Sequence, residues 1–299
     1  MRISTGQIQQ TMLGSLQSNY SQYGRLQMQM ASGKEILQPS DDPIGSVALL
    51  GLKKEQKSLT QYQDNISQVK TQLSQDEVLI GSMTEMLLRV QDLTQTAANG
   101  TNGTAELKAF AVELRQIQQG LEDVANSKDE NGSYLFSGTK VDQKPVVKDL
   151  SGSYLGPQGD NLSREVAVAH GVTISANDNA SDLFFSSGNF FQQFDTFISA
   201  LETATGPVST EANTMLAQLT STQSDISSVR SSIGARINTL EQLDSSHSEM
   251  KLFSEEVSNE IQSLDYSAAA TKMSDVLLAL QVTQQSFGKV NNLSLFNYI

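Results

Sequence analysis

Few residues of this chain have side chains that could do covalent or metal chemistry. Among 299 residues there is no cysteine, which excludes thiolate nucleophiles, disulfides, iron–sulfur clusters and cysteine-based zinc sites. The two histidines, His170 and His247, lie far apart in the sequence and make a poor start for a metal site or a catalytic triad. Neither a phosphate-binding glycine loop nor a nucleophile elbow occurs. We therefore expect no enzyme activity and no cofactor.

Carboxylates are the remaining candidates for chemistry. The run from Asn177 to Asp182 has the carboxylate density of a calcium loop, but it lacks the central glycine and the glutamate at the twelfth position. It is therefore interpreted as a solvated turn. A hydrolase that uses a carboxylate pair is the weakest functional alternative, because the candidate acids of this region all stand in turn-like contexts: Asp142, Asp149, Asp160, Asp178 and Asp182.

Charge and hydropathy argue against two further classes of partner. The 20 basic side chains against 33 acidic ones give a formal net charge of −13, so the electrostatic footprint of a nucleic-acid-binding protein is missing. The longest apolar runs, Val47–Leu50 and Val276–Leu280, are far shorter than the roughly 20 residues of a membrane helix. Residues 1–16 lack the apolar core of a cleaved secretory signal, so we expect export, if any, by another route.

The elements that carry these residues are predicted to be long helices. The five prolines leave residues 44–144 and 208–299 uninterrupted. Positions spaced alternately by three and four residues from Leu59 are apolar in ten of twelve cases, which predicts a narrow seam for partner helices. The seam comprises Leu59, Tyr62, Ile66, Val69, Leu73, Asp76, Ile80, Met83, Leu87, Val90, Thr94 and Ala97; it continues in Leu107, Phe110, Leu114, Ile117, Leu121 and Val124, and in a return run from Ile226 to Leu264 that includes Met250. On this return run, His247 is expected to be a hydrogen-bonded packing residue, whereas His170 should face water.

The same spacing marks one helix near each end of the chain. The first includes Leu13, Leu16, Tyr20, Tyr23, Gln27 and Met30, and the second Met273, Val276, Leu280, Thr283, Phe287 and Val290. Gln27 and Thr283 depart from the apolar pattern. These seams bury little apolar surface for the conformational entropy that ordering them costs, so we expect the terminal pair to order by docking against neighbouring subunits. The alternative is a self-contained bundle in which the pair packs back onto the long helices.

Element boundaries have local causes. Asp42 followed by Pro43 predicts a helix start, because the carboxylate can accept an orphan N–H and proline has none to lose. That helix should run to about Asn99, where a turn-rich segment ending at Gly103 predicts a helical hairpin. Alternation in residues 164–175 predicts short strands. Six phenylalanines within fourteen residues are expected to form the core beside them: Phe184, Phe185, Phe190, Phe191, Phe194 and Phe197.

These signals predict a mainly α fold with a small β insert. The chain should form a long antiparallel helical shaft, with paired N- and C-terminal helices and the β domain at the far end. The predicted domains are a terminal coiled-coil assembly domain (residues 1–42 and 265–299), a helical shaft domain (43–130 and 187–264) and a β-rich insert domain (131–186).

Several short segments resemble bacterial flagellins and their relatives, and their order and spacing carry the resemblance. On the N-terminal side they are Met1–Thr5, Ala31–Lys34, Pro39–Gly45 with Asp41, Asp42, Pro43 and Gly45, and Tyr134–Thr139; on the return side they are Ser228–Arg230, Ile233–Arg236 and Leu264–Tyr266. The Gln-rich start, the small insert and the ending Leu293–Ile299 are similar to the hook-associated branch of this family, found at the hook–filament junction.

The resemblance implies a structural subunit, secreted unfolded by the flagellar type III pathway and transiently cytoplasmic before export. It implies as partners further copies of the chain in a ring, hook-associated protein 1, flagellin and an export chaperone, with no nucleic acid and no membrane insertion. The alternatives are flagellin itself and a non-flagellar coiled-coil adaptor. The implied assembly positions are Leu13, Leu16, Tyr20, Tyr23, Met30, Met273, Val276, Leu280, Phe287 and Leu295.

Overall fold

The computed structural model describes residues 5–292 and is mainly helical. The chain divides into two compact units, a terminal unit of residues 1–58 with 249–299 and a shaft unit of residues 59–248. Along the chain the elements are α1 (Thr5–Ser32), α2 (Pro43–Ala98), α3 (Thr104–Ala125), β1 (Glu165–Ala169), β2 (Val172–Ser175), the short π-helical turn η1 (Ser181–Phe185), α4 (Phe190–Glu202), α5 (Ser209–Gln262) and α6 (Tyr266–Asn292).

Helix α2 begins and ends where the sequence predicts. The Ile44 N–H donates to Asp42 Oδ1 at 3.0 Å, so Asp42 caps a helix whose first residue is Pro43. At the other end, the Asn102 side-chain amide donates to the Thr96 carbonyl oxygen at 2.6 Å. Asn102 thereby supplies a donor to one of the carbonyl groups in the last turn of α2. The predicted hairpin between α2 and α3 is confirmed.

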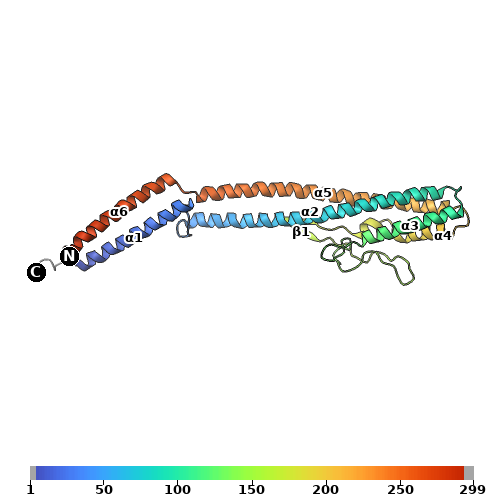
Figure 1. Cartoon of the computed structure of the whole chain (residues 1–299), viewed down its shortest axis with the longest axis horizontal. Helices are drawn as coiled ribbons and strands as arrows, with labels where there is room; N and C mark the ends of the chain where they lie inside the picture. The colour runs from blue at the N-terminus through green and yellow to red at the C-terminus, as the bar shows by residue number, and fades with distance from the viewer. Residues whose placement is uncertain (1–4, 293–299) are drawn as a thin grey trace. The chain divides into compact units, whose positions relative to one another are not determined.

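The predicted seam of α2 is the spine of the shaft unit. Every position of the frame from Leu59 to Ala97 is buried except Tyr62, which is half-buried. Helix α5 runs antiparallel to α2, as side-chain contacts show (Figure 1): Gln63 donates to Ser248 Oγ at 2.9 Å, and Lys70 pairs with Glu241 at 2.6 Å. The assignment of Met250 to the seam of α5 is wrong, because its side chain is 45% exposed.

The β insert packs on the side of the shaft. Strands β1 and β2 form a two-stranded antiparallel sheet, as the alternation predicts. The Ala167 carbonyl oxygen accepts from Asn65 Nδ2 of α2 at 2.7 Å, and the Val168 carbonyl oxygen lies 2.7 Å from His247 Nε2 of α5. The expectation of a β domain at the far end is therefore wrong, because the shaft ends at the α2–α3 turn (Figure 1). The buried His247 is the predicted packing histidine, and His170 is exposed.

The insert also contains a repeat that sequence reasoning missed. The motif Lys-Asp-x-x-Gly-Ser-Tyr-Leu occurs at Lys128–Leu135 and again at Lys148–Leu155. Asp129 Oδ1 accepts from the Ser133 N–H at 2.8 Å, and Asp149 Oδ1 accepts from the Ser153 N–H at 2.9 Å. In each copy the glycine has a positive φ and the lysine lies over the tyrosine ring, at 4.5 and 4.4 Å. The two copies therefore fold as equivalent turns.

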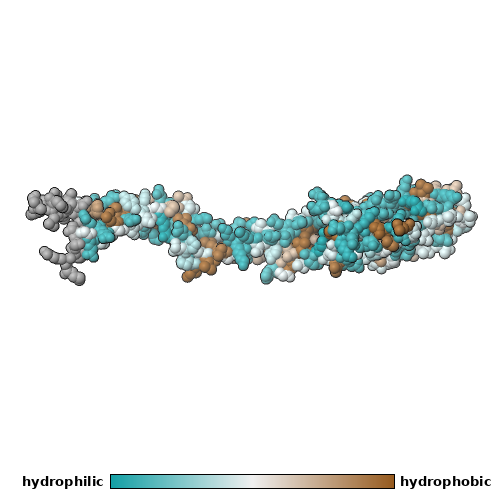
Figure 2. All heavy atoms as spheres, turned by 90° about the horizontal axis from the view of Figure 1, so that it is seen from below, coloured by the Kyte–Doolittle hydropathy of each residue, from teal (hydrophilic) through white to brown (hydrophobic). Residues whose placement is uncertain are grey.

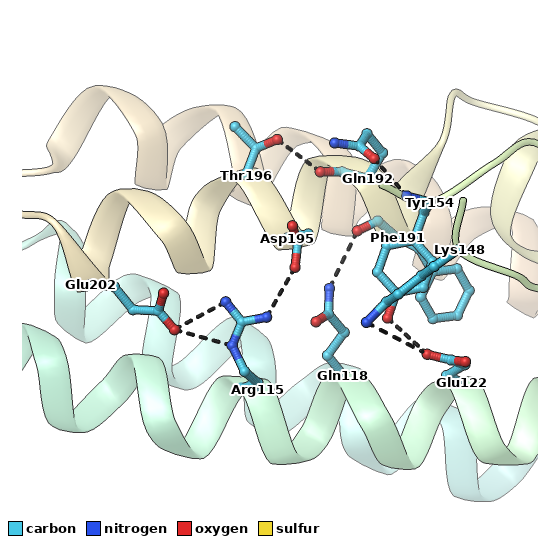
Figure 3. Close-up of polar contacts among 10 residues, drawn as sticks. All are labelled: Arg115, Gln118, Glu122, Lys148, Tyr154, Phe191, Gln192, Asp195, Thr196 and Glu202. Carbon is cyan, nitrogen blue, oxygen red and sulfur yellow. Dashed lines mark hydrogen bonds and ion pairs between the residues drawn. The ribbon is translucent and has the colours of Figure 1, made fainter. Parts of the chain in front are cut away.

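The phenylalanine cluster joins the insert to the helices, as predicted. Five of the six predicted rings are buried and Phe185 packs against them at their edge. Figure 3 shows the polar contacts around this core: Arg115 of α3 pairs with Asp195 and Glu202 of α4, at 3.0 Å each. In the second repeat, the Tyr154 hydroxyl donates to Glu122 at 2.9 Å. Helices α3 and α4 and the insert thus form one interlocked part of the shaft unit.

Candidate assembly interface

The terminal unit has a thin internal seam between α1 and α6. Figure 1 shows the two helices side by side, and their buried contacts consist of Leu26 from α1 with Val276 and Leu280 from α6. Tyr23 and Met273 pack against these three residues. Such a small apolar core stabilises a pair of helices of 28 and 27 residues weakly, because each buried side chain contributes about 1.5 to 3 kcal/mol.

Both helices carry a second apolar face that nothing within the described terminal unit covers. On α1, Leu13 is 51% exposed and Met28 57%; on α6, Leu278 is 61% exposed and Val282 54%. Figure 2 shows apolar patches, coloured brown, on the otherwise mostly polar surface of this unit. A helix that is apolar on two opposite sides is typical of one that packs against more than one partner.

Nine of the ten predicted assembly residues lie in the described part of the chain, and they differ in how far they are buried. Tyr23, Met273, Val276 and Leu280 face the internal seam, and Leu13 and Tyr20 are exposed. Leu16, Met30 and Phe287 are half-buried, as is Thr283, while Leu295 lies outside the described residues. Gln27 is exposed, and the buried residue next to it, Leu26, was missed.

The missed residue has a physical explanation. Leu26 follows Tyr23 by three positions, whereas the strict three–four alternation selected Gln27, at four positions. Both spacings lie on one face of a helix with 3.6 residues per turn. The available signal in the sequence was therefore the apolar Leu26 directly before the polar Gln27.

Two family-like segments meet at the base of the terminal helices. The Leu264 N–H donates to the Gly33 carbonyl oxygen at 3.0 Å, and the Glu35 N–H donates to the Gln262 carbonyl oxygen at 2.8 Å. Gly33 has φ +68°, a backbone conformation that residues other than glycine rarely adopt. Asp265 then caps α6, accepting from the Ser267 and Ala268 N–H groups. This backbone pairing fixes where α1 ends and α6 begins.

The segment before α2 is held by its two aspartates. Asp41 pairs with Arg25 of α1 and accepts from the Gln38 N–H at 3.0 Å, and that backbone hydrogen bond holds the pKa of Asp41 below its usual value. A Cβ on Gly45 would collide with Asp42 Oδ2 and with Ile36 Cδ1, so a larger residue there would displace the capping side chain. A groove of about 640 Å³ lies between α1 and this segment, lined by Ser21, Arg25, Met28, Ala31, Ser32, Leu37, Gln38 and Asp41.

The candidate ligands of the described residues do not form a metal site. Among residues 5–292, no three His, Cys, Asp or Glu side chains gather as metal ligands would. The helices within this range include none long and apolar enough to cross a membrane. Asp178, one of the candidate acids, is bound by Arg236 instead, at 2.6 and 2.7 Å.

Known proteins with the same sequence pattern and fold are flagellar. Residues 3–141 match the bacterial flagellin N-terminal helical region. The chain is 26% identical to flagellar hook-associated protein 3 of Escherichia coli K12 and, equally, to that of Salmonella typhimurium, over 99% of both chains in each case. A solved flagellar hook-associated protein from Vibrio parahaemolyticus is 35% identical, with a TM-score of 0.70 over 75% of this chain and 100% of that one. This chain belongs to the flagellar hook-associated protein 3 family.

The fold agrees with that membership. Hook-associated protein 3 from Legionella pneumophila has a TM-score of 0.65, covering 70% of this chain and 98% of that one at 20% identity, and so shares the fold. The family-like segments Ala31–Lys34 and Leu264–Tyr266 are the ones that pair at the base of α1 and α6. In this hook-associated protein, the residues that carry the resemblance therefore shape the terminal unit.

Proposed function

We propose that this hook-associated protein is a non-catalytic structural subunit that works by axial self-assembly at the hook–filament junction of the bacterial flagellum. As a member of the hook-associated protein 3 family it is a junction component rather than the filament subunit. The observation that carries the proposal is the terminal helix pair, which has a thin internal seam and a second, exposed apolar face. Such a pair gains stability when copies of it pack together.

The proposed interface uses both faces of the terminal helices. Tyr23, Met273, Val276 and Leu280 hold α1 against α6, and the exposed Leu13 faces the neighbouring subunit. Tyr20 belongs to both, because its hydroxyl accepts from Gln284 of α6 at 2.8 Å while half of its side chain stays exposed. Phe287, Leu16 and Met30 are half-buried and belong to the same proposed interface. Leu295 belongs to the same proposed interface. On this proposal, order in the terminal pair is coupled to assembly, because burial of the outer face adds the stability that the thin internal seam does not supply alone.

The proposed partners are further copies of the chain in a ring, hook-associated protein 1 on the hook side and flagellin on the filament side. We further propose export through the flagellar type III pathway, with a cytoplasmic chaperone before export. A relative from Legionella pneumophila that is described as a flagellar junction protein supports the location. The weak seam of the terminal pair supports export as an unfolded chain, since little folding free energy opposes its opening.

A deletion strain tests the function. Without this protein, we expect flagellin to appear in the culture medium while hooks remain bare, because filament growth lacks its adapter. Complementation with the wild-type gene should restore filaments. If instead the deletion removed the main exported subunit, so that no flagellin reached the medium, the chain would be the filament subunit. Normal filaments in the deletion strain would defeat the junction role.

A further inference from the structure

One acidic residue interrupts the apolar seam of α2. Asp76 lies between Leu73 and Ile80 on the seam and is completely buried. Neither oxygen of its carboxyl group meets a donor in good hydrogen-bond geometry, and the side-chain amide of Gln72, one turn earlier, is close enough to act only as a weak donor to it. A buried polar group in this state is costly, and an ionised one far more so.

Charged groups from two other parts of the chain act electrostatically on Asp76. From α5 comes Arg236, which donates to both oxygens of Asp178 and, at 3.0 Å, to the Ser175 carbonyl oxygen at the end of β2. From the insert come Asp178 itself and Arg164, whose Nε atom is buried without a partner. Residues 164–178, which we call the docked segment, are therefore tied to α5 by Arg236, whose charge also acts on Asp76.

The protonation of Asp76 matters to these contacts near neutral pH. Desolvation by burial, followed by the negative charge of Asp178, raises the pKa of Asp76 to about 7, against the opposing effects of Gln72, Arg164 and Arg236. As a neutral acid, Asp76 fits its apolar seam. As a carboxylate it requires a stronger donor than the Gln72 amide, such as water or an arginine, and the arginines whose charges act on it, Arg164 and Arg236, belong to the docked segment or hold it on α5.

We propose that Asp76 is a pH-sensitive latch: its neutral acid keeps the docked segment closed on α2 and α5, and its carboxylate loosens that segment. The latch lies in the shaft unit and is independent of the assembly role of the terminal helices. Asn65 and His247 also hold β1 on the shaft, so the segment has attachments besides the latch.

Hydrogen exchange on the full-length protein tests the latch. Protection factors of the Glu165–Ser175 peptide, corrected for intrinsic exchange, should fall by about tenfold or more between pH 5.5 and pH 8.5. A peptide from α3 is the internal reference and should not change. In Asp76→Asn, which is neutral at every pH and nearly the same size, protection should stay high throughout. Asp178→Asn, which removes the partner of Arg236, should lower protection at both pH values.

His247 must be separated from Asp76, because its ring contacts β1 and its Nδ1 atom is buried without a partner. A His247→Gln variant should keep the wild-type dependence on pH. Flat protection in the wild type, or a dependence that survives in Asp76→Asn and disappears in His247→Gln, would overturn the proposal. Isotope-edited infrared spectroscopy gives a second reading on the wild type. A buried protonated carboxyl band must be present at pH 5.5 and absent at pH 8.5, and its absence at pH 5.5 would equally overturn the latch.

Discussion

Two leucines of α6 lie on different faces of the helix, one in the internal seam and the other on the outer face. Leu280 is 6% exposed and packs against α1, whereas Leu278 is 61% exposed on the other side of the same helix. Truncating a buried leucine to alanine costs about 2 to 5 kcal/mol. We expect Leu280→Ala to lie near the lower end, at roughly 2 to 3 kcal/mol, because its surroundings are thin. That change raises the open population of the α1–α6 pair by about 30- to 150-fold, at 1.4 kcal/mol per factor of ten.

Hydrogen exchange of the purified protein measures this opening directly. In Leu280→Ala, the amides of α1 and α6 should exchange faster by that factor, while those of α3 in the shaft unit should not change. Leu278→Ala should leave exchange within about 0.5 kcal/mol of the wild type, since surface substitutions rarely cost more. Its effect should appear in assembly, as lost association between subunits. Leu278→Ala opening the pair as much as Leu280→Ala, or unchanged exchange in Leu280→Ala, would refute the division into two faces.

Three further substitutions test the cap, the buried acid and the repeated turn. Gly45→Ala should destabilise the start of α2 by about 1 to 3 kcal/mol in urea unfolding, because the new Cβ displaces the Asp42 cap, whereas Gly51→Ala, with open space around it, should be neutral or stabilising. Because the pKa of Asp76 is raised, the folded state binds its proton more tightly than the unfolded state does. The free energy of unfolding should therefore fall as pH rises from about 4 to 7, by about 4 kcal/mol in total at 1.36 kcal/mol per pKa unit. Asp76→Leu should remove this dependence on pH, as measured by urea unfolding at several pH values. Tyr154→Phe should cost about 1 to 2 kcal/mol through the lost hydrogen bond to Glu122, and an equal cost for Tyr134→Phe would show that this bond is not the cause.

The shaft was predictable because a long antiparallel helix pair keeps one period over its whole length. Burial of the α2 frame, the cap at Asp42 and the strands in residues 164–175 are confirmed, since each depends on residues near in sequence. The three-part domain division stays a prediction. The seam of α1 was off by one position because a spacing pattern does not determine how a helix rotates against its partner, as Leu26 shows.

The position of the insert could not be read from local pattern. It is set by hydrogen bonds between residues more than 70 positions apart, such as Asn65 with Ala167 and His247 with Val168. Asp76 looked like a simple exception to the apolar frame, and only the fold shows Arg164 and Arg236 acting on it from other elements. The inner face of the candidate assembly interface was partly predictable, because its residues follow the helical spacing in the sequence.

The paired Lys-Asp-x-x-Gly-Ser-Tyr-Leu turns have a consequence for how this protein can change. Each turn is closed by bonds from its own aspartate to backbone within the motif, so its shape does not depend on the rest of the insert. The second copy is anchored to Glu122 of α3 through Tyr154 and Lys148, and the corresponding residues of the first copy, Tyr134 and Lys128, contact each other instead. We therefore expect that one copy could be added or removed as a whole module while the helices stay as they are.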